Sequence, residues 1–240
     1  SDARMLAVYK KQMRAYFTTP IGYVVIALYL ALTETVLALT MLFSSEATHI
    51  DYYFLAQIII FIIMIPLLTM KLFSEERKLK TEQLLLTSPV SLTAMVFAKF
   101  CAAFTMFCSV FIFSTVLNTI VLSRFGEINI AVIIGNAIGI LLIGAAFCAI
   151  GSFFSALTEN QIVAAVSAIA TLGALVALNL LNLFLPSGFL KTMVSWISIW
   201  ERYNDFTYGM FNIGSLVYFL SFVIVFLFLT VRVYERKRWA

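Results

Sequence analysis

Charged side chains are scarce in this sequence. Asp, Glu, Lys and Arg make up 12% of its 240 residues, whereas hydrophobic residues make up 62%. A soluble globular domain has about 25% charged residues and about 45–50% apolar residues. The shortage of charge therefore excludes an ordinary soluble domain and predicts a membrane protein.

The sequence also lacks the motifs of common hydrolytic enzymes. It has no Gly-Lys dipeptide, and hence no phosphate-binding loop of the form G-x-x-x-x-G-K-[ST]. Its single histidine, His49, is followed by Ile50, which excludes an H-E-x-x-H zinc site, and a serine protease triad would need that same histidine. We therefore predict that this chain has no catalytic residue, binds no metal or cofactor, and is not an enzyme on its own.

Long apolar runs account for most of the chain. A membrane-spanning helix needs about 20 residues of this kind. Runs of that length occur at 21–43, 54–72, 94–122, 128–157, 162–185 and 213–231. Because they are continuous, they favour helices over the alternating strands of about 10 residues that form membrane barrels. The sequence predicts an all-α polytopic membrane protein, with six transmembrane helices in a single transmembrane domain over 1–240.

The basic residues are unevenly distributed among the segments between these runs. Of the 16 Lys and Arg residues, all but three lie in 1–20, in 71–99 or in the tail from residue 232. Cytoplasmic loops carry such an excess of basic residues. We therefore predict a multi-pass protein of the cell (cytoplasmic) membrane with both termini in the cytoplasm. The net charge of +4 then reflects topology and implies no nucleic-acid partner.

Two segments outside the spans have the pattern of membrane-surface helices. Residues 1–20 place Met5, Tyr9 and Met13 at helical spacing and end at Pro20, which predicts an amphipathic elbow helix on the inner leaflet. In 186–212 the apolar stretch is too short to span a bilayer, and aromatic residues such as Trp196 and Trp200 accompany it. This pattern predicts an outer re-entrant hairpin before the sixth span.

A single carboxylate lies deep in a predicted span. Glu34 falls within the run 21–43, between Thr33 and Thr35. A carboxylate at the centre of a span costs at least about 2.5–3.5 kcal/mol on insertion scales. One interpretation is that Glu34 belongs to a transport pathway. The alternative is that it reaches water at the outer surface or forms a structural pair within the bundle.

A charged block follows the second apolar run. Seven of the twelve residues in 71–82 are charged. Around it, Leu72, Leu79 and Leu86 recur at heptad spacing, which predicts a short helix over 73–91 with one apolar side and exposed charge. Such a helix suits the recognition of a partner protein. The alternative is a solvated loop that only sets orientation, but orientation needs Lys and Arg and not the acids of this block.

The sequence of this block resembles that of ABC-2 type transporter permeases. The resemblance is carried by Glu75-Glu76-Arg77-Lys78, Thr81, the run LLLTSPV at 84–90 and Lys99-Phe100. It extends over nearly all of the chain and is closest to the gliding-motility-associated branch of that family. The chain departs from the family pattern at Lys80, where a glycine is common, and at Gln83, where an acid is common.

The resemblance implies a permease that forms the membrane pathway of an exporter. A separate ABC ATPase subunit would hold ATP and Mg²⁺, and segment 73–91 would dock on it. The coupling residues would be Glu75, Glu76, Arg77, Lys78, Lys80, Thr81, Glu82, Leu84, Leu85 and Leu86. Two permeases, as a homodimer or as a related pair, would join two ATPase subunits, and an extracytoplasmic accessory protein is a further candidate partner.

The same resemblance draws attention to a polar stretch before the last span. Its members here are Glu201, Arg202, Asn204 and Asp205. One interpretation is that they gate the outer exit of the pathway. The alternative is ordinary solvation at the membrane surface.

Two other classes of membrane protein compete with this interpretation. An ATP-independent secondary transporter or channel usually carries several ionisable residues at the midplane, and here only Glu34 lies deep in a span. A structural scaffold without transport is the second alternative. Copurification of a stoichiometric ATPase would favour the permease, whereas ion flux without nucleotide would favour the secondary transporter.

Overall fold

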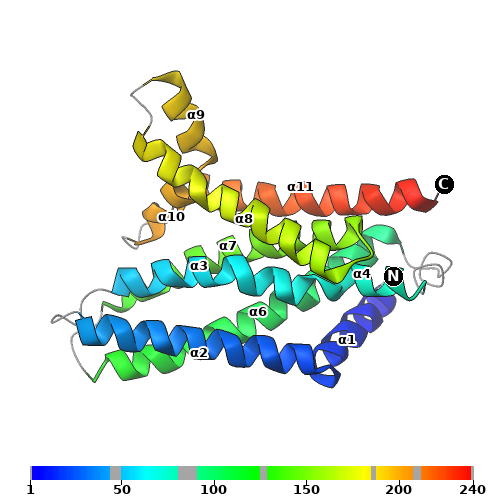
Figure 1. Ribbon diagram of the computed structural model, residues 1–240, viewed down its shortest axis with the longest axis horizontal. Coiled ribbons are helices and arrows are strands. Elements are labelled where there is room, and N and C mark those ends of the chain that lie inside the picture. Colours follow the sequence, from blue (N-terminus) through cyan, green and yellow to red (C-terminus); the bar gives the residue numbers. More distant parts are fainter. Residues whose placement is uncertain are drawn as a thin grey trace.

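The computed structural model describes residues 2–43, 50–80, 91–124, 129–184, 188–207 and 212–238. In this part of the chain every regular element is a helix (Figure 1). The helices are α1 (Asp2–Thr18), α2 (Pro20–Phe43), α3 (Ile50–Thr69), α4 (Lys71–Lys78), α6 (Leu92–Leu122), α7 (Ile130–Leu157), α8 (Gln161–Phe184), α9 (Phe189–Ile197), α10 (Ile199–Thr207) and α11 (Ile213–Arg238).

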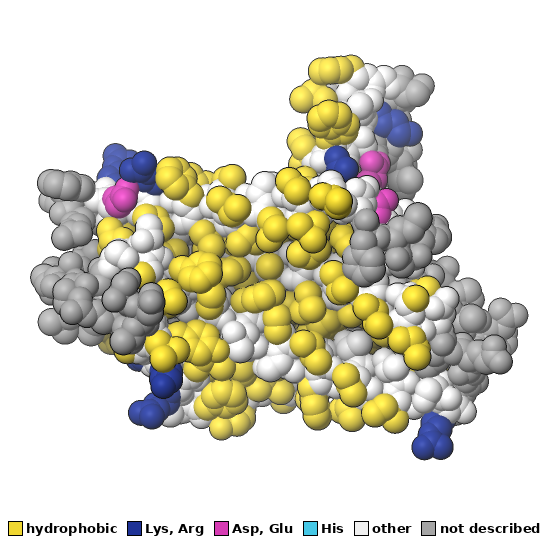
Figure 2. All heavy atoms as spheres, turned by 180° about the vertical axis from the view of Figure 1, so that it is seen from behind, with side chains coloured by type: hydrophobic (Ala, Val, Ile, Leu, Met, Phe, Trp, Pro, Cys, Tyr) yellow, Lys and Arg dark blue, Asp and Glu magenta, His cyan; other side chains and the backbone are white. Residues whose placement is uncertain are grey.

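Six helical segments of the described chain are long and apolar enough to cross a membrane. They are α2, α3 continued by α4, α6, α7, α8 and α11. The prediction of six transmembrane helices in an all-α membrane protein is confirmed. Figure 2 shows a matching surface, in which hydrophobic side chains cover the middle of the bundle and Lys and Arg side chains lie toward its ends.

The bundle is organised around α7. This helix contacts α3, α4, α6, α8, α10 and α11. Glycines allow two of these neighbours to come close, since a Cβ atom at Gly144 would overlap the ring of Phe107 in α6 and one at Gly151 would overlap Thr69 in α3. The two chain ends lie at the same end of the bundle as α4, and α9 and α10 lie at the opposite end (Figure 1). Which end faces the cytoplasm stays a prediction.

A sharp turn joins α1 to α2. Pro20 begins α2, a helical position at which the missing proline N–H causes no loss. The hydroxyl of Tyr16 donates to the carbonyl oxygen of Leu68 at the end of α3, at 3.1 Å. Burial raises the pKa of the Tyr16 hydroxyl above its ordinary value. These contacts hold α1 against the bundle, and its place on the inner leaflet stays a prediction.

Gly22 permits the close approach of α1 and α2. A Cβ atom at this position would collide with the backbone carbonyl oxygen of Tyr16, which cannot swing away as a side chain does. We expect Gly22→Ala to lower the free energy of unfolding by about 1–3 kcal/mol, measured by thermal unfolding in detergent. The matched control is Gly173→Ala in α8, because a Cβ atom there meets nothing within 4 Å. Equal stability of the two variants would contradict the prediction.

The segment before the last span folds as two short helices. Each of α9 and α10 has nine residues, and Ser198 lies between them. The hydroxyl of Tyr203 in α10 donates to Oδ1 of Asn136 in α7 at 2.6 Å, and both residues are buried. Because this bond lies in the interior, it fixes α10 on the bundle. The insertion of this segment into the outer leaflet stays a prediction.

Candidate functional site

The charged block begins as α4, which follows α3 after a break at Met70. The first backbone N–H groups of a helix have no partner within that helix. Here Oγ of Ser155 in α7 accepts from the backbone N–H groups of Phe73 at 3.1 Å and Ser74 at 3.3 Å. The same hydroxyl donates to the carbonyl oxygen of Met70 at 2.8 Å. Ser155 therefore ties the start of α4 to α7.

Glu76 of α4 pairs with two lysines from different helices. Its Oε1 lies 3.3 Å from Nζ of Lys11 in α1, and its Oε2 pairs with Nζ of Lys99 in α6. Lys99 is the deeper of the two, with 1% of its side chain exposed. Its ammonium group also donates to the carbonyl oxygen of Leu72 at 2.6 Å and lies 4.4 Å from the centre of the Phe73 ring. One carboxylate of α4 thus joins α1 to α6.

Arg77 attaches the other side of α4 to the turn between α7 and α8. Its Nε lies 3.2 Å from Oε1 of Glu159, and its Nη1 donates to the carbonyl oxygen of Leu157 at 2.7 Å. Leu157 is the last residue of α7, so its carbonyl group has no partner within the helix. Arg77 supplies that partner, and α4 is held to α7 at both of its ends.

The other charged side chains of the block that the structure describes are Lys71, Glu75 and Lys78 in α4 and Lys80 just after it. Lys78 and Lys80 are exposed, and Lys71 and Glu75 are half-buried. Within the described residues, no ion pair engages any of these four side chains. Glu76 and Arg77 therefore bind to the chain's own bundle, whereas these four form no ion pair with it.

The leucines of the heptad differ in burial. Leu72 is fully buried, whereas 64% of Leu79 is exposed. The helix α4 ends at Lys78, and Lys80 takes a left-handed backbone with φ of 55°, so the predicted helix over 73–91 does not continue unbroken through Lys80. That conformation costs a non-glycine residue about 1 kcal/mol. Leu86 lies outside the described residues.

The rest of the predicted coupling segment lies outside the described residues. This concerns Thr81, Glu82, Leu84, Leu85 and Leu86. Their role in docking stays a prediction.

A second polar cluster surrounds Glu34 in α2. Asn118 of α6 is buried beside it, and its amide is oriented by two partners. The amide oxygen accepts from the hydroxyl of Tyr53 in α3 at 2.7 Å, and the nitrogen donates to the two carboxylate oxygens of Glu34 at 2.9 and 3.2 Å. The Glu34 side chain is otherwise exposed on the surface of the bundle. The structure is consistent with both interpretations of Glu34. The hydrogen bonds to Asn118 form a structural pair, and the exposed part of the side chain could face water or a transport pathway.

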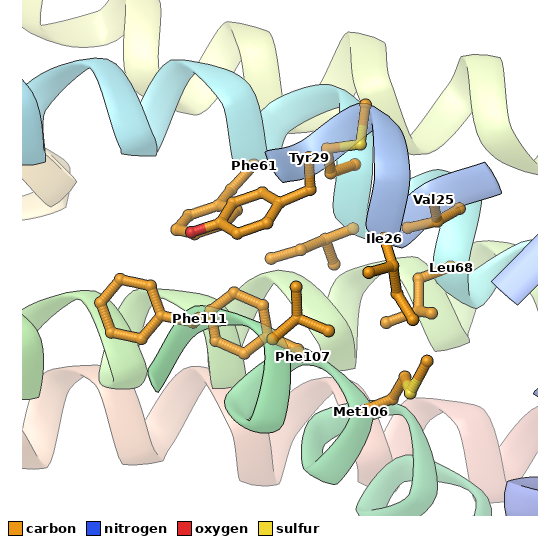
Figure 3. Close-up of a pocket in the computed structure, with 11 residues that line it drawn as sticks. Val25, Ile26, Tyr29, Phe61, Leu68, Met106, Phe107 and Phe111 are labelled. Carbon is orange, nitrogen blue, oxygen red and sulfur yellow. The ribbon is translucent and has the colours of Figure 1, made fainter. Parts of the chain in front are cut away.

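Tyr29 connects this polar cluster to an apolar cleft between α2, α3 and α6 (Figure 3). Its hydroxyl donates to Oε1 of Gln57 at 2.9 Å, and its ring stacks on Phe61 with centroids 5.5 Å apart. Phe107 and Phe111 of α6 form the opposite wall. Apart from the Tyr29 hydroxyl, the side chains that line the cleft are apolar. The cleft therefore fits hydrocarbon, and hydrogen-bonding groups begin at its Tyr29 rim.

The sequence alone pointed to Glu34 but not to the residues around it. Gln57 and Asn118 are each only 1% exposed. Buried amides inside apolar runs are costly unless they are hydrogen-bonded, and this is a signal that could have found them. Tyr53 carries no such signal, because tyrosine is common near the ends of membrane spans.

The four outer candidates lie in α10 and differ in their surroundings. Glu201 and Asn204 are exposed. Oδ2 of Asp205 accepts from Nδ2 of Asn212 at 2.9 Å and from Oγ of Ser215 at 3.0 Å, which joins α10 to the start of α11. Arg202 lies over the ring of Tyr218, 5.8 Å from its centre. A gating role for this group stays a prediction.

Comparison with known proteins assigns the chain to a family. Residues 25–235 match the model of a family described as ABC-2 family transporter protein. No curated protein matches the chain. The match is to the family as a whole, so the gliding-motility-associated branch stays a prediction. Among the described residues, no group of three His, Cys, Asp or Glu side chains is placed to hold a metal ion.

Proposed function

Because the chain belongs to the ABC-2 transporter family and is an ABC transporter permease, we propose that α4 transmits the movements of a separate ATPase subunit to the membrane helices. A transporter of this family works with an ABC ATPase. The outward charges of α4 and the segment that follows it form the docking surface in this proposal. The inward charges of α4 carry the movement into the bundle.

One observation carries the proposal, namely the double pairing of Glu76. Through Lys11 and Lys99, Glu76 binds α1 and α6, while Ser155 and Arg77 bind α4 to α7. A helix attached at so many points moves with its neighbours as a unit. Displacement of α4 by the ATPase would therefore rotate these helices as a rigid body, which is a common form of switching transition.

The proposal includes the arrangement of subunits. Two copies of the chain, or one copy and a related permease, pair with two ATPase subunits that hold ATP and Mg²⁺. The end of the bundle with α4 and both termini faces the cytoplasm of a cell membrane, and the substrate is exported. An extracytoplasmic accessory protein, if one takes part, meets the opposite end, where the polar residues of α10 gate the exit.

Glu34 lines the transport pathway in this proposal. Its carboxylate receives two hydrogen bonds from Asn118 and is otherwise exposed on α2. Exposure of a carboxylate to lipid is costly, so its open side requires water or polar groups. A pathway between two permease copies would supply them. The open side of Glu34 therefore favours a pathway role over a purely structural pair.

The docking surface can be tested with Glu75→Lys. We expect this variant to reduce the amount of ATPase subunit that copurifies with the permease about fivefold, because a rim charge contributes about 1 kcal/mol to association. Its own folding should be unchanged, since no ion pair engages Glu75 within the described residues. The measurement is the ATPase-to-permease ratio after purification, together with nucleotide-dependent transport.

The matched control is Lys10→Glu, which reverses an exposed charge on α1 at the same end of the bundle. This variant should retain the ATPase. If Glu75→Lys retains as much ATPase as Lys10→Glu does, the docking assignment is wrong. Robust ion flux without nucleotide would favour the secondary transporter instead.

A further inference from the structure

The helix α9 presents an apolar stripe that no described residue covers. Its members are spaced at i, i+4, i+7 and i+8, which places them on one side of a helix. They are Phe189, Met193, Trp196 and Ile197, with 78%, 50%, 68% and 45% of each residue exposed. In Figure 2 the projection that includes α9 and α10 has yellow side chains along one side, with charged side chains on the other side and toward its base.

An arginine without an anionic partner lies one helix further along. Within the described residues, Arg202 of α10 forms no ion pair, and its Nε is buried without a hydrogen-bond acceptor. Its guanidinium group lies over the face of the Tyr218 ring, 5.8 Å from the ring centre. The hydroxyl of Ser198, four residues earlier, is also buried without a partner. Buried donors of this kind are normally satisfied, and within the described residues no anion balances the charge of Arg202, whose side chain is partly exposed.

The nearby carboxylates do not supply that acceptor. Asp205 is engaged by Asn212 and Ser215. Glu201 directly precedes Arg202, and consecutive residues of a helix do not face each other. The guanidinium group of Arg202 therefore keeps its charge available, on a residue that is partly exposed.

The position of these residues identifies the missing partner. Tyr218 lies in the second turn of α11, which is a membrane span beginning at Ile213, and its hydroxyl donates to the carbonyl oxygen of Ile197 at 2.6 Å. Arg202 therefore lies near the end of a span, at the depth of lipid headgroups. The apolar stripe of α9 begins beside it, at the depth where aromatic side chains meet acyl chains.

We propose that α9 and Arg202 form a binding surface for an anionic phospholipid. The guanidinium fork of Arg202 receives the phosphate diester oxygens, a geometry for which arginine is well suited. The stripe of α9 packs against the acyl chains of the same lipid. An occupant with both an anion and hydrocarbon matches the two halves of the surface, whereas a free phosphate ion matches only one.

The test uses the fluorescence of Trp196 in nanodiscs. The chain has three tryptophans, so Trp200→Phe and Trp239→Phe leave Trp196 as the only one. Quenching is measured with brominated acyl chains carried either by phosphatidylglycerol or by phosphatidylcholine, each as the minor lipid. We expect quenching by both, with about fivefold preference for phosphatidylglycerol, because one basic residue near the surface contributes a factor of that size.

Arg202→Gln should abolish the preference while leaving quenching by phosphatidylcholine in place. The matched control is Lys191→Gln, which removes an exposed charge from α9 about opposite to the stripe. This control should keep the preference. Unchanged thermal stability of both variants confirms that they are folded.

Three results would overturn the proposal. Equal quenching by the two brominated lipids would remove the headgroup assignment. Loss of the preference on addition of excess inorganic phosphate, but not of chloride at equal ionic strength, would assign the site to free phosphate. Absence of quenching by any lipid would mean that the stripe is covered by protein, such as a second copy of the chain.

Discussion

Glu76→Leu is expected to lower the free energy of unfolding by about 3–5 kcal/mol, because removing one partner of a buried ion pair leaves the other charge uncompensated. The charge that loses its carboxylate partner in this variant is that of Lys99, of which only 1% of the side chain reaches the surface. Thermal or denaturant unfolding in detergent measures the loss.

The double variant Glu76→Leu/Lys99→Met separates stability from coupling. Replacing both members of a buried ion pair with apolar residues is often neutral or stabilising. The double variant should therefore recover most of the lost stability. Both the single and the double variant should have lower nucleotide-dependent transport than the wild type, because in both of them no ion pair of residue 76 joins α4 to α1 and α6.

A surface pair provides the control for this cycle. Arg232 and Glu235 are both substantially exposed, and pairs of this kind contribute about 0–1 kcal/mol. Glu235→Leu should therefore change the stability little. If the double variant is as unstable as Glu76→Leu, the loss is not caused by the unpaired lysine. If it transports at the wild-type rate, Glu76 does not transmit the movement.

Glu34→Gln is expected to lower ligand-stimulated ATP hydrolysis by the reconstituted complex at least about tenfold, a change of about 1.4 kcal/mol in the barrier. Glutamine keeps the shape of the side chain but loses the charge that would face the pathway. The stability of the permease should not fall, since an ionised carboxylate in a span is itself unfavourable by at least about 2.5–3.5 kcal/mol. Activity and thermal stability are measured on the same preparations.

Two further variants complete this prediction. Asn118→Leu removes the amide between Tyr53 and Glu34, so it should lower both activity and stability, the latter by about 1–3 kcal/mol for the polar groups left unpaired. Thr35→Val is the matched control, because Thr35 is exposed on α2 and donates only to Ala31 of its own helix. A Glu34→Gln permease as active as Thr35→Val would show that Glu34 has no role in transport.

The order of the helices could be predicted from the sequence, because it depends on the length of the apolar runs and on the positions of residues that break helices. Six apolar runs correspond to six spanning segments, and Pro20 marks the end of the first helix as expected. The helix predicted over 73–91 ends at Lys78 for a local reason. Periodicity assumes that a helix continues, whereas Lys80 has a left-handed backbone.

The sequence predicted only some of the residues that form each candidate site. Glu34 was conspicuous because a charge in an apolar run is rare, but its neighbours Tyr53 and Asn118 come from two other helices. Arg202 was noted as one of four polar residues, yet its lack of an acidic partner is visible only once α10 and α11 are packed together. Spacing within one helix carries no information on such contacts.

The sequence alone determined that this is a six-span membrane protein and that the sequence contains no phosphate-binding loop of the form G-x-x-x-x-G-K-[ST]. Both properties depend only on the order of consecutive residues, namely the length of each apolar run and the presence of a short motif. Only the tertiary structure decided which charges of the block at 71–82 serve the chain itself. Glu76 binds Lys11 and Lys99, which are 65 and 23 residues away, whereas the adjacent Glu75 forms no ion pair in the described chain. The two glutamates have the same chemistry, and their difference arises because neighbouring residues of a helix face different sides, one toward the bundle and one toward a partner.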